Sequence, residues 1–306
     1  MKKIIYLFLA LPFLAFSGEF QEDSTATNSL DSVLSTQDPE TIAYFEKIKR
    51  VATMEYQTEI VDLGKNVATL TVPAGYKFLN SEDSKYVLTE LWGNLPSETY
   101  GLIFPDTASP LNCSNTFVIS LSYDESGYIE DDDAEDLDYQ EILEGLIEDQ
   151  KAANTERKAQ GMAEMDLVGW AQTPFYDMEA KKLHWATEYI VEGYEDNVLN
   201  YDVKILGRKG MLTMSILGDV SVLPQIKENI DVFINSTEFK PGFTYAEFDP
   251  EFDDVAAYGI GGLIAGKVLA KAGIFVLLLK FWKVVALGFG AIVLGIKKFF
   301  GSKSEE

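Results

Sequence analysis

The fold class follows from one segment, Val198-Leu-Asn-Tyr-Asp-Val-Lys-Ile-Leu-Gly-Arg-Lys-Gly-Met-Leu-Thr-Met-Ser-Ile-Leu217. It contains two strand-like runs, Val198–Leu206 and Met211–Leu217, joined by Gly207-Arg-Lys-Gly210. Glycines at both ends of so short a connection are typical of a tight hairpin turn. Two further strand-like runs, Leu167–Ala171 and Leu183–Val191, precede this segment. The four runs together predict an antiparallel meander.

Helices and shorter strands surround the meander. Apolar residues at helical or alternating spacing, bounded by capping and turn residues, predict where they lie. In chain order they are a helix over 39–54, a hairpin of strands 58–63 and 67–72, a helix over 81–92, strands over 100–104 and 116–123, a helix that reaches Lys158 and ends before Gly161, and a helix over 222–235. The sequence therefore predicts an α+β fold, a mostly antiparallel sheet with packed helices.

Capping signals set several of these boundaries. Asp38 followed by Pro39 predicts the start of the first helix. Ser81, which is followed by two acidic residues, and Ser221 are the predicted N-caps of the second and the last helix. The segment Val72-Pro-Ala-Gly-Tyr-Lys-Phe-Leu79 is interpreted as a turn that ends the first hairpin.

Composition divides the chain into five parts. We interpret them as a signal peptide (1–17), a flexible polar leader (18–38), an extracytoplasmic α+β domain (39–254), a membrane-anchoring segment (255–300) and a charged tail (301–306). The central part is long enough to bury one hydrophobic core.

The N-terminus has the pattern of a secretory signal. Lys2 and Lys3 precede the apolar run Ile4–Phe16, and small residues lead to a cleavage site predicted after Ser17,. An uncleaved anchor is the alternative, but this run is shorter than the about 20 residues that a membrane span needs.

The apolar stretch that begins at Val255 predicts attachment to a lipid bilayer. The leading interpretation is one tilted helix over 275–296, with Lys280 and Lys283 extending toward one interface or facing a partner protein,. A lysine near the middle of the bilayer costs roughly 2.5–3.5 kcal/mol, so the depth of these two residues matters.

A pair of helices, 255–279 and 281–300, is the alternative for the same stretch. Lys267 and Lys271 lie four residues apart on one face of the first helix, as in a helix that lies in the membrane interface. This arrangement is a hairpin or one interfacial and one inserted helix.

Charge and small residues suggest how the anchor is placed. The basic tail, 297–303, obeys the positive-inside rule if it stays in the cytoplasm, which leaves the bulk of the chain outside. Gly262, Gly266 and Ala270 form a row of small residues that permits close helix approach and hence self-association. A single-pass protein of the cell membrane is the predicted location.

The charge of the chain excludes one class of function. The formal net charge is −24, and both predicted ends are basic, so the central part is more acidic still. Such a surface repels nucleic acid, and we expect no nucleic-acid partner.

The lone cysteine and the lone histidine exclude several chemistries. Cys113 is expected to be buried, and His184 to be exposed on a strand opposite Leu183 and Trp185,. One His and one Cys cannot assemble an ordinary zinc site, and no Gly-x-Ser-x-Gly elbow accompanies His184. We therefore assign no catalytic, cofactor-binding or metal-binding residues from these side chains or from a known motif.

Two charged segments are candidates for ligand sites. The acidic run Glu130–Asp138 lacks the glycine and the distal glutamate of an EF-hand loop, and it is interpreted as a helix N-terminus rather than a cation site. Arg208 and Lys209 at the hairpin tip are interpreted as solvated rather than anion-binding.

The chain resembles a bacterial family of uncharacterised membrane-anchored proteins, domain of unknown function family 2167, over roughly residues 58–300. That family implies an anchored extracytoplasmic domain and assigns no catalytic residues. The order of elements is similar to the α/β sandwiches of the PsbP and Mog1 type. The family resemblance rests on Gly127-Tyr-Ile-Glu-Asp-Asp-Asp-Ala134, Ala152-Ala-Asn-Thr-Glu-Arg-Lys158, Gly169-Trp170, Leu183-His-Trp-Ala186, Asn200-Tyr-Asp-Val-Lys-Ile-Leu-Gly-Arg208, Tyr245-Ala-Glu-Phe248 and Leu279-Lys-Phe-Trp282.

Two functions fit the sequence. The first is a membrane-tethered, non-enzymatic domain that binds or scaffolds a partner in the cell envelope, with Lys280 and Lys283 as candidate contacts to another membrane protein. The second is a hydrolase or transferase built from carboxylates, for example Glu130 and Asp132 near Tyr128.

Overall fold

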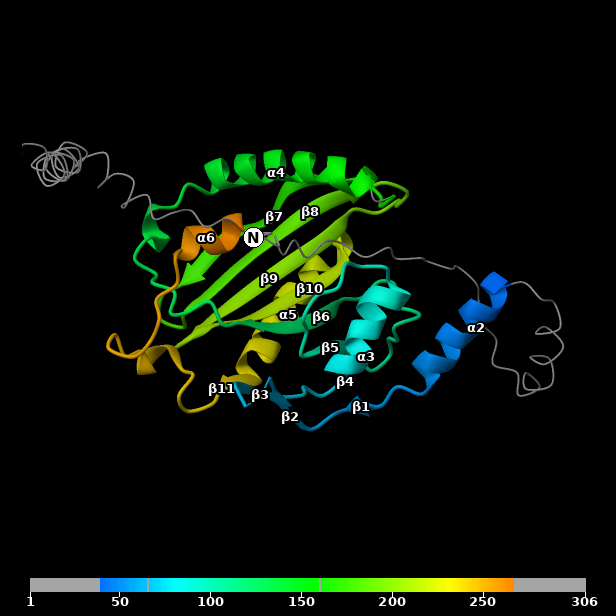
Figure 1. The fold of residues 1–306 in the computed structure, drawn as a ribbon, viewed down its shortest axis with the longest axis horizontal. Helices are drawn as coiled ribbons and strands as arrows, with labels where there is room; N and C mark the ends of the chain where they lie inside the picture. The colour runs from blue at the N-terminus through cyan, green and yellow to red at the C-terminus, as the bar shows by residue number, and fades with distance from the viewer. Residues whose placement is uncertain (1–38, 65, 160, 267–306) are drawn as a thin grey trace, which may run out of the picture.

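The computed structural model describes residues 39–64, 66–159 and 161–266, drawn in colour in Figure 1. The predicted signal peptide, the leader and the chain beyond Gly266 lie outside these residues. So do Lys280 and Lys283.

The centre of the fold is an antiparallel sheet of eight strands. Their order is β1-β4-β5-β6-β10-β9-β8-β7. The predicted meander forms one half of this sheet, and the α+β class with a mostly antiparallel sheet is confirmed. The strands are β1 (Tyr56–Gln57), β4 (Tyr76–Asn80), β5 (Gly101–Pro105), β6 (Val118–Asp124), β7 (Met165–Asp177), β8 (Lys182–Val191), β9 (Val198–Gly207) and β10 (Gly210–Asp219).

A small second sheet and the helices cover the two faces. The second sheet has the order β11-β3-β2, and it contains the predicted first hairpin. Figure 1 shows α4, α6 and α3 on one face of the main sheet and α5 on the other. The bounds are β2 (Ile60–Leu63), β3 (Ala68–Thr71), β11 (Thr237–Phe239), α2 (Pro39–Ala52), α3 (Ser81–Tyr86), α4 (Tyr139–Ala159), α5 (Leu223–Asn235) and α6 (Ile260–Ala265).

One face of the main sheet carries a continuous hydrophobic core. Alternate residues of β9 and β10, such as Leu199, Val203 and Met214, pack there against Phe233 of α5 and Leu70 of β3. Each fully buried side chain of this kind contributes about 1.5–3 kcal/mol relative to an exposed one. The second sheet and α5 therefore close one side of the molecule.

The opposite face carries three separate apolar clusters. Leu102 and Leu217 pack beneath α3 and the π-helical turn that follows it. Trp185 packs with residues of α6, and Met165 packs with Val191. The centre of this face belongs to none of the three clusters.

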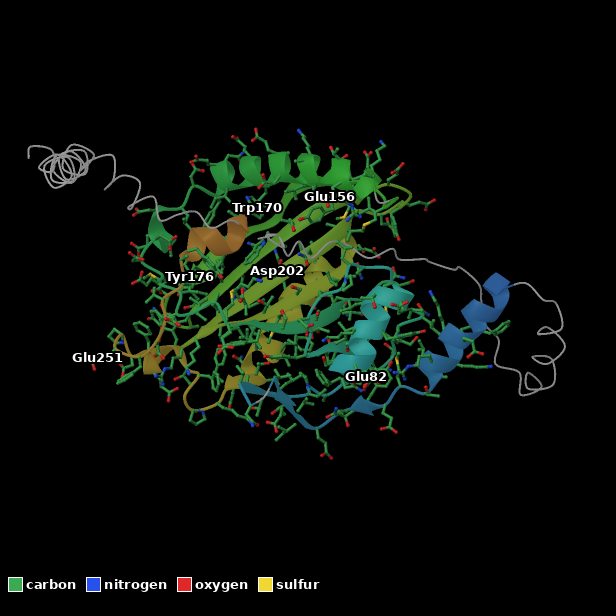
Figure 2. All side chains as sticks on the ribbon, viewed as in Figure 1. Glu82, Glu156, Trp170, Tyr176, Asp202 and Glu251 are labelled. Carbon is green, nitrogen blue, oxygen red and sulfur yellow. The ribbon has the colours of Figure 1, made fainter. Side chains whose placement is uncertain are left out.

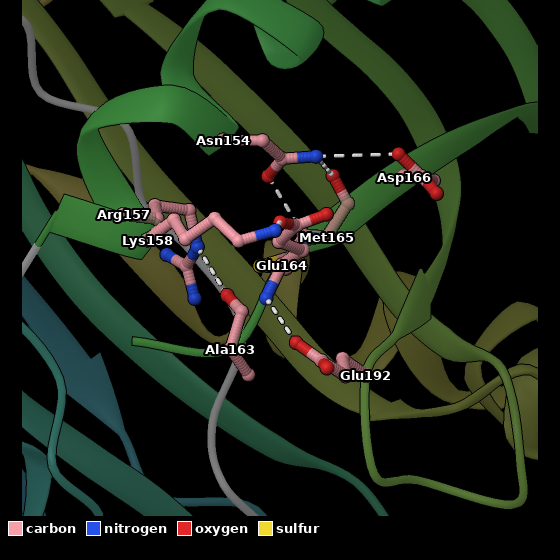
Figure 3. A network of polar contacts seen from close by, with 8 residues as sticks. All are labelled: Asn154, Arg157, Lys158, Ala163, Glu164, Met165, Asp166 and Glu192. Atoms are coloured by element: carbon pink, nitrogen blue, oxygen red, sulfur yellow. Dashed lines mark hydrogen bonds and ion pairs between the residues drawn. The ribbon is translucent and has the colours of Figure 1, made fainter. Parts of the chain in front are cut away.

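Polar contacts fix α4 to the edge strand β7 (Figure 3). The side chain of Asn154 donates to Met165 O at 2.7 Å and accepts from Met165 N at 2.9 Å. Arg157 Nε donates to Ala163 O at 2.7 Å. These bonds satisfy backbone groups at the start of β7, a strand whose pairing with β8 contains several register shifts. Such irregularities are common on edge strands, where they discourage further pairing.

Several predicted boundaries differ from the structure. The segment from Val72 to Leu79 was predicted to be a turn, but its second half belongs to β4. The turn ends at Gly75, and Tyr76 already pairs with β5. The N-cap of α3 is Asn80, whose side chain accepts from Asp83 N, and not Ser81. Ser221 does not cap α5 either, since a 3-10 turn, Val220–Val222, precedes that helix.

From the sequence, the domain was predicted to end at residue 254. In the structure, residues after 254 also pack on the main sheet. Ala256, Ile260 and Leu263 are buried and pack with Leu183 and Trp185 of β8. Among the described residues, no helix is both long and apolar enough to cross a membrane.

The aromatic centre of the core gives a first prediction. Phe233 is fully buried, 4.7 Å from the ring of Tyr76 and 6.1 Å from that of Phe117 between ring centroids. Phe233→Ala should lower the free energy of unfolding by about 3–5 kcal/mol, because it leaves a cavity. Urea unfolding of the full chain in mild detergent, followed by tryptophan fluorescence, measures the change.

The neighbouring residue supplies the matched control. Val232 is 47% exposed on the same helix, so Val232→Ala should change the free energy of unfolding by at most about 0.5 kcal/mol. Equal effects of the two substitutions would contradict the packing of α5 described above.

Candidate functional site

The centre of the sheet face opposite α5 is polar. On β9, Asn200, Asp202 and Lys204 share this face because alternate residues of a strand point the same way,. The register places Ser215 of β10 opposite Asp202, and Thr213 opposite Lys204. It continues in both directions to β6 and β8. We call this set the polar strip, and it consists of Ser120, Thr187, Asn200, Asp202, Lys204, Thr213 and Ser215.

Most of the polar strip is buried. Asp202 is 7% exposed and Ser215 1%, whereas Asn200 and Lys204 are partly exposed. Figure 2 labels Asp202 over the middle of the sheet, with α4 and α6 on one side and α3 on the other. The polar strip therefore separates the three apolar clusters of this face.

Asp202 is held by two hydrogen bonds. Ser215 Oγ donates to Asp202 Oδ1 at 2.6 Å, and Asn200 Nδ2 donates to Asp202 Oδ2 at 2.9 Å. A carboxylate offers about four acceptor positions, so this one has capacity left. Among the ion pairs of the described residues, none includes Asp202.

Lys204 lies two residues further along the same strand. Its Nζ donates to Thr213 Oγ1 at 3.0 Å and lies 5.7 Å from the centroid of the Trp185 ring. Burial lowers the pKa of this ammonium group, and the charges of Asp202 and Asp124 oppose that effect. An ammonium group has three donors, and one of them is accounted for by Thr213.

Asn200 contributes an acceptor without a partner. Its Oδ1 atom is buried and receives no hydrogen bond in the described part of the chain. Exchanging the amide atoms would place an oxygen against the carboxylate of Asp202, so the orientation with Nδ2 toward Asp202 is the favourable one,. An unpaired buried acceptor costs about 1–3 kcal/mol.

The polar strip lowers the stability of the folded state relative to an apolar surface of the same shape. Replacing buried charged groups by apolar side chains of similar volume is often neutral or stabilising, by about 1–4 kcal/mol. The unpaired Oδ1 atom of Asn200 and the buried carboxylate of Asp202 make the polar strip the candidate binding site.

The acidic run forms a second polar centre, which acts as a clamp. Asp131 accepts hydrogen bonds from Lys181 Nζ and Tyr176 OH, both at 2.7 Å, and from Tyr245 OH at 3.2 Å. Burial raises the pKa of Asp131, but the hydrogen bonds from Lys181 and Tyr176 outweigh it and hold the pKa below its usual range. Three segments that are distant in sequence meet at this carboxylate.

The carboxylates of the enzymatic hypothesis do not share this centre. Asp132 is exposed and Glu130 is partly exposed, while the residue between them, Asp131, points into the protein. Tyr128 stacks on Phe248, with a centroid distance of 3.8 Å. The ring of Tyr128 thus packs against the segment that contains Phe248.

Other acids of the run hold helix ends. Asp138 Oδ1 accepts from Gln140 N at 2.9 Å and caps α4, as predicted for this run. Asp133 instead accepts from Ile260 N at 2.8 Å and Gly261 N at 3.0 Å, the first turn of α6. Within the described residues, no group of three or more His, Cys, Asp or Glu side chains could hold a metal ion.

The remaining candidates occupy ordinary structural positions. Cys113 is buried as expected, 4% exposed, and burial raises the pKa of its thiol to about 12. His184 was expected to be exposed, but it is partly buried near Phe175 and Tyr201, and burial lowers its pKa. Arg208 Nε donates to Asp253 at 2.6 Å and so is engaged within the protein.

Sequence analysis missed the polar strip, although its signal was present. Asn200, Asp202 and Lys204 alternate with Leu199, Tyr201 and Val203 in the quoted segment. That alternation is the normal pattern of a strand with one solvated face. Burial of the polar face depends on neighbouring strands and helices, which one strand does not reveal.

The sequence family is established over most of the chain. Residues 55–295 match the family described as "Protein of unknown function (DUF2167)". No curated protein matches the chain.

Two solved structures are similar to the chain at low identity. The solution structure of cyanobacterial PsbP (CyanoP) from Synechocystis sp. PCC 6803 shows 11% identity and a TM-score of 0.33, covering 62% of this chain and 94% of that one. The crystal structure of the Saccharomyces cerevisiae Ran-binding protein Mog1p shows 10% identity and a TM-score of 0.33, covering 61% and 96%. Likeness at this level carries no argument, so a PsbP- or Mog1-type sandwich stays a prediction.

The clamp at Asp131 predicts a pH dependence. Asp131→Ala should lower the free energy of unfolding at pH 7 by about 2–4 kcal/mol, because hydrogen bonds to a charged group are lost. The folded-state pKa lies below the ordinary value of 3.8. The contribution is therefore complete above that value and disappears as the pH falls through the lowered folded-state pKa.

Urea unfolding of the full chain between pH 3 and pH 7 checks this prediction. The difference between Asp131→Ala and the unchanged chain should shrink toward the acid end of that range. Asp132→Ala removes an exposed neighbouring carboxylate and should have an effect of at most about 0.5 kcal/mol. A difference that persists unchanged at acid pH would show that Asp131 acts by packing and not by charge.

Proposed function

We propose that this chain, which belongs to the family of proteins of unknown function DUF2167, is a membrane-anchored extracytoplasmic domain that binds a polar ligand on its polar strip without catalysing a reaction. The observation that carries the binding function is that, within the described residues, Asn200 Oδ1 has no hydrogen-bond partner and neither Asp202 nor Lys204 takes part in an ion pair. The ligand supplies the hydrogen bonds and charges that these groups lack.

Support for the anchor comes from the sequence. An export signal precedes the domain, and the apolar stretch over 275–296 follows it with a basic tail, 297–303, on its far side,. This arrangement leaves the domain outside the cytoplasm and the tail inside it. The lipid bilayer is then one partner of the chain, and a membrane protein that contacts Lys280 and Lys283 is a further candidate partner.

The enzymatic alternative has less support. Its proposed acids, Glu130 and Asp132, flank a carboxylate that is used to hold Lys181 and Tyr176 together. General acid–base catalysis needs groups that reach the same substrate atom or its neighbours. The pairing of polar groups on the polar strip supports reversible binding instead.

Thiol labelling on intact cells tests the anchor and the orientation. Ser221 is exposed in the 3-10 turn that precedes α5, whereas the native Cys113 is buried. An impermeant maleimide should label Ser221→Cys on intact cells. It should label Ser302→Cys only after the cells are lysed. The parental chain, with Cys113, should stay unlabelled until it is denatured. Labelling of Ser302→Cys from outside would contradict the single span, and loss of the protein from the membrane fraction would contradict the anchor.

Ligand screening on the full chain in mild detergent tests the binding function. A ligand at 100 times its Kd stabilises a protein by about 2.7 kcal/mol, which a thermal shift detects. We expect small polar compounds to raise the Tm of the unchanged chain and to leave that of an Asn200→Leu, Asp202→Leu, Lys204→Met variant unaffected. That variant should itself be at least as stable as the unchanged chain. A variant that unfolds, or a complete screen without any shift, would assign the polar strip to structure.

A further inference from the structure

We propose, on the basis of the binding function above, that the ligand of the polar strip is a zwitterionic peptide of about two residues. Its ammonium group is bound by Asn200 and Asp202, and its carboxylate by Lys204 and Thr213. The inference comes from two different deficits on one strand, a deficit of donors at one end and of acceptors at the other.

The donor deficit lies at Asn200 and Asp202. Asn200 Oδ1 is buried without a partner, and Asp202 is 7% exposed with two neutral hydrogen-bond donors. No cationic group of the described residues lies within ion-pair distance of Asp202. A buried carboxylate without an ion-pair partner is destabilising. An ammonium group supplies both the charge and a donor for Asn200.

The acceptor deficit lies at Lys204. Its ammonium group donates to the hydroxyl of Thr213 and faces the ring of Trp185, and neither group is an anion. The carboxylates of Asp202 and Asp124 act on it through their field, but neither is an ion-pair partner in the described structure. A ligand carboxylate would accept from both remaining donors.

The spacing selects the size of the ligand. Asp202 and Lys204 are two residues apart on an extended strand, which separates their Cα atoms by about 7 Å. An extended dipeptide spans about the same length, since each residue covers about 3.3–3.6 Å. A free amino acid is shorter than this separation, and a polyamine or a simple anion satisfies one deficit and leaves the other.

Binding of four probes to the full chain in mild detergent tests the proposal by calorimetry. The probes are glycylglycine, its N-acetyl derivative, its C-terminal amide, and acetate. We expect glycylglycine to bind, and we expect each derivative to bind at least tenfold more weakly. Lys204→Met should bind glycylglycine and the amide equally. Asp202→Asn should bind glycylglycine and the N-acetyl derivative equally. These two losses of discrimination assign each end of the ligand to its residue.

A charge-matched control lies on the other face of the sheet. Lys227 is exposed on α5, and Lys227→Met should leave all four affinities unchanged. Equal binding of acetate and glycylglycine would overturn the zwitterion in favour of a simple anion site. If no probe binds while the wider screen yields another ligand, the ligand class is wrong and the binding function stands. If neither experiment gives a ligand, both proposals fall.

Discussion

The rest of the structure depends on how β9 and β10 divide their side chains between two faces. One face of this hairpin meets α5 and the second sheet in a continuous apolar core. Residues that alternate with that core, Asp202 and Ser215 among them, are thereby forced onto the other face, because successive side chains of a strand point to opposite sides,. The packing of one face fixes the register, and a slip of one residue would exchange core and polar strip.

The acidic residues have a structural function that net charge does not suggest. Asp131 and Asp133 accept hydrogen bonds from Lys181 and from the backbone of α6, and so join the middle of the chain to its later elements. Each carboxylate replaces water with several fixed donors, and hydrogen bonds to charged groups are the stronger ones. The chain has a net charge of −24. Basic side chains and helix N-termini are therefore few relative to the carboxylates that they could pair with. Asp131 and Asp133 receive such partners and connect distant elements, whereas their neighbour Asp132 is exposed.

Local patterns predicted most of the fold, and long-range contacts account for what they missed. The meander was predicted because alternation and the Gly207–Gly210 turn are contained in the hairpin itself. The strand β4 was missed because it is short and directly follows the Pro73-Ala-Gly75 turn. The helix α6 could not be separated from the apolar stretch by composition, since its N-terminus is fixed by Asp133, 127 residues earlier in the chain. The polar strip likewise appears in the sequence as an alternation on one strand. Its burial depends on distant elements, so the sequence did not predict it.

The core on the α5 face stabilises the fold without the polar strip on the opposite face. Because the α5 face holds a continuous core, stability does not require the opposite face to be apolar at its centre. That face instead keeps its apolar contacts in three clusters around the polar strip, where helices α3, α4 and α6 are attached. Contacts of the proposed ligand with Asn200 and Lys204 could then change without unfolding the sheet. A site in this position combines a rigid support, two central strands paired on both sides, with a buried acceptor, Asn200 Oδ1, that has no hydrogen-bond partner in the described part of the chain,.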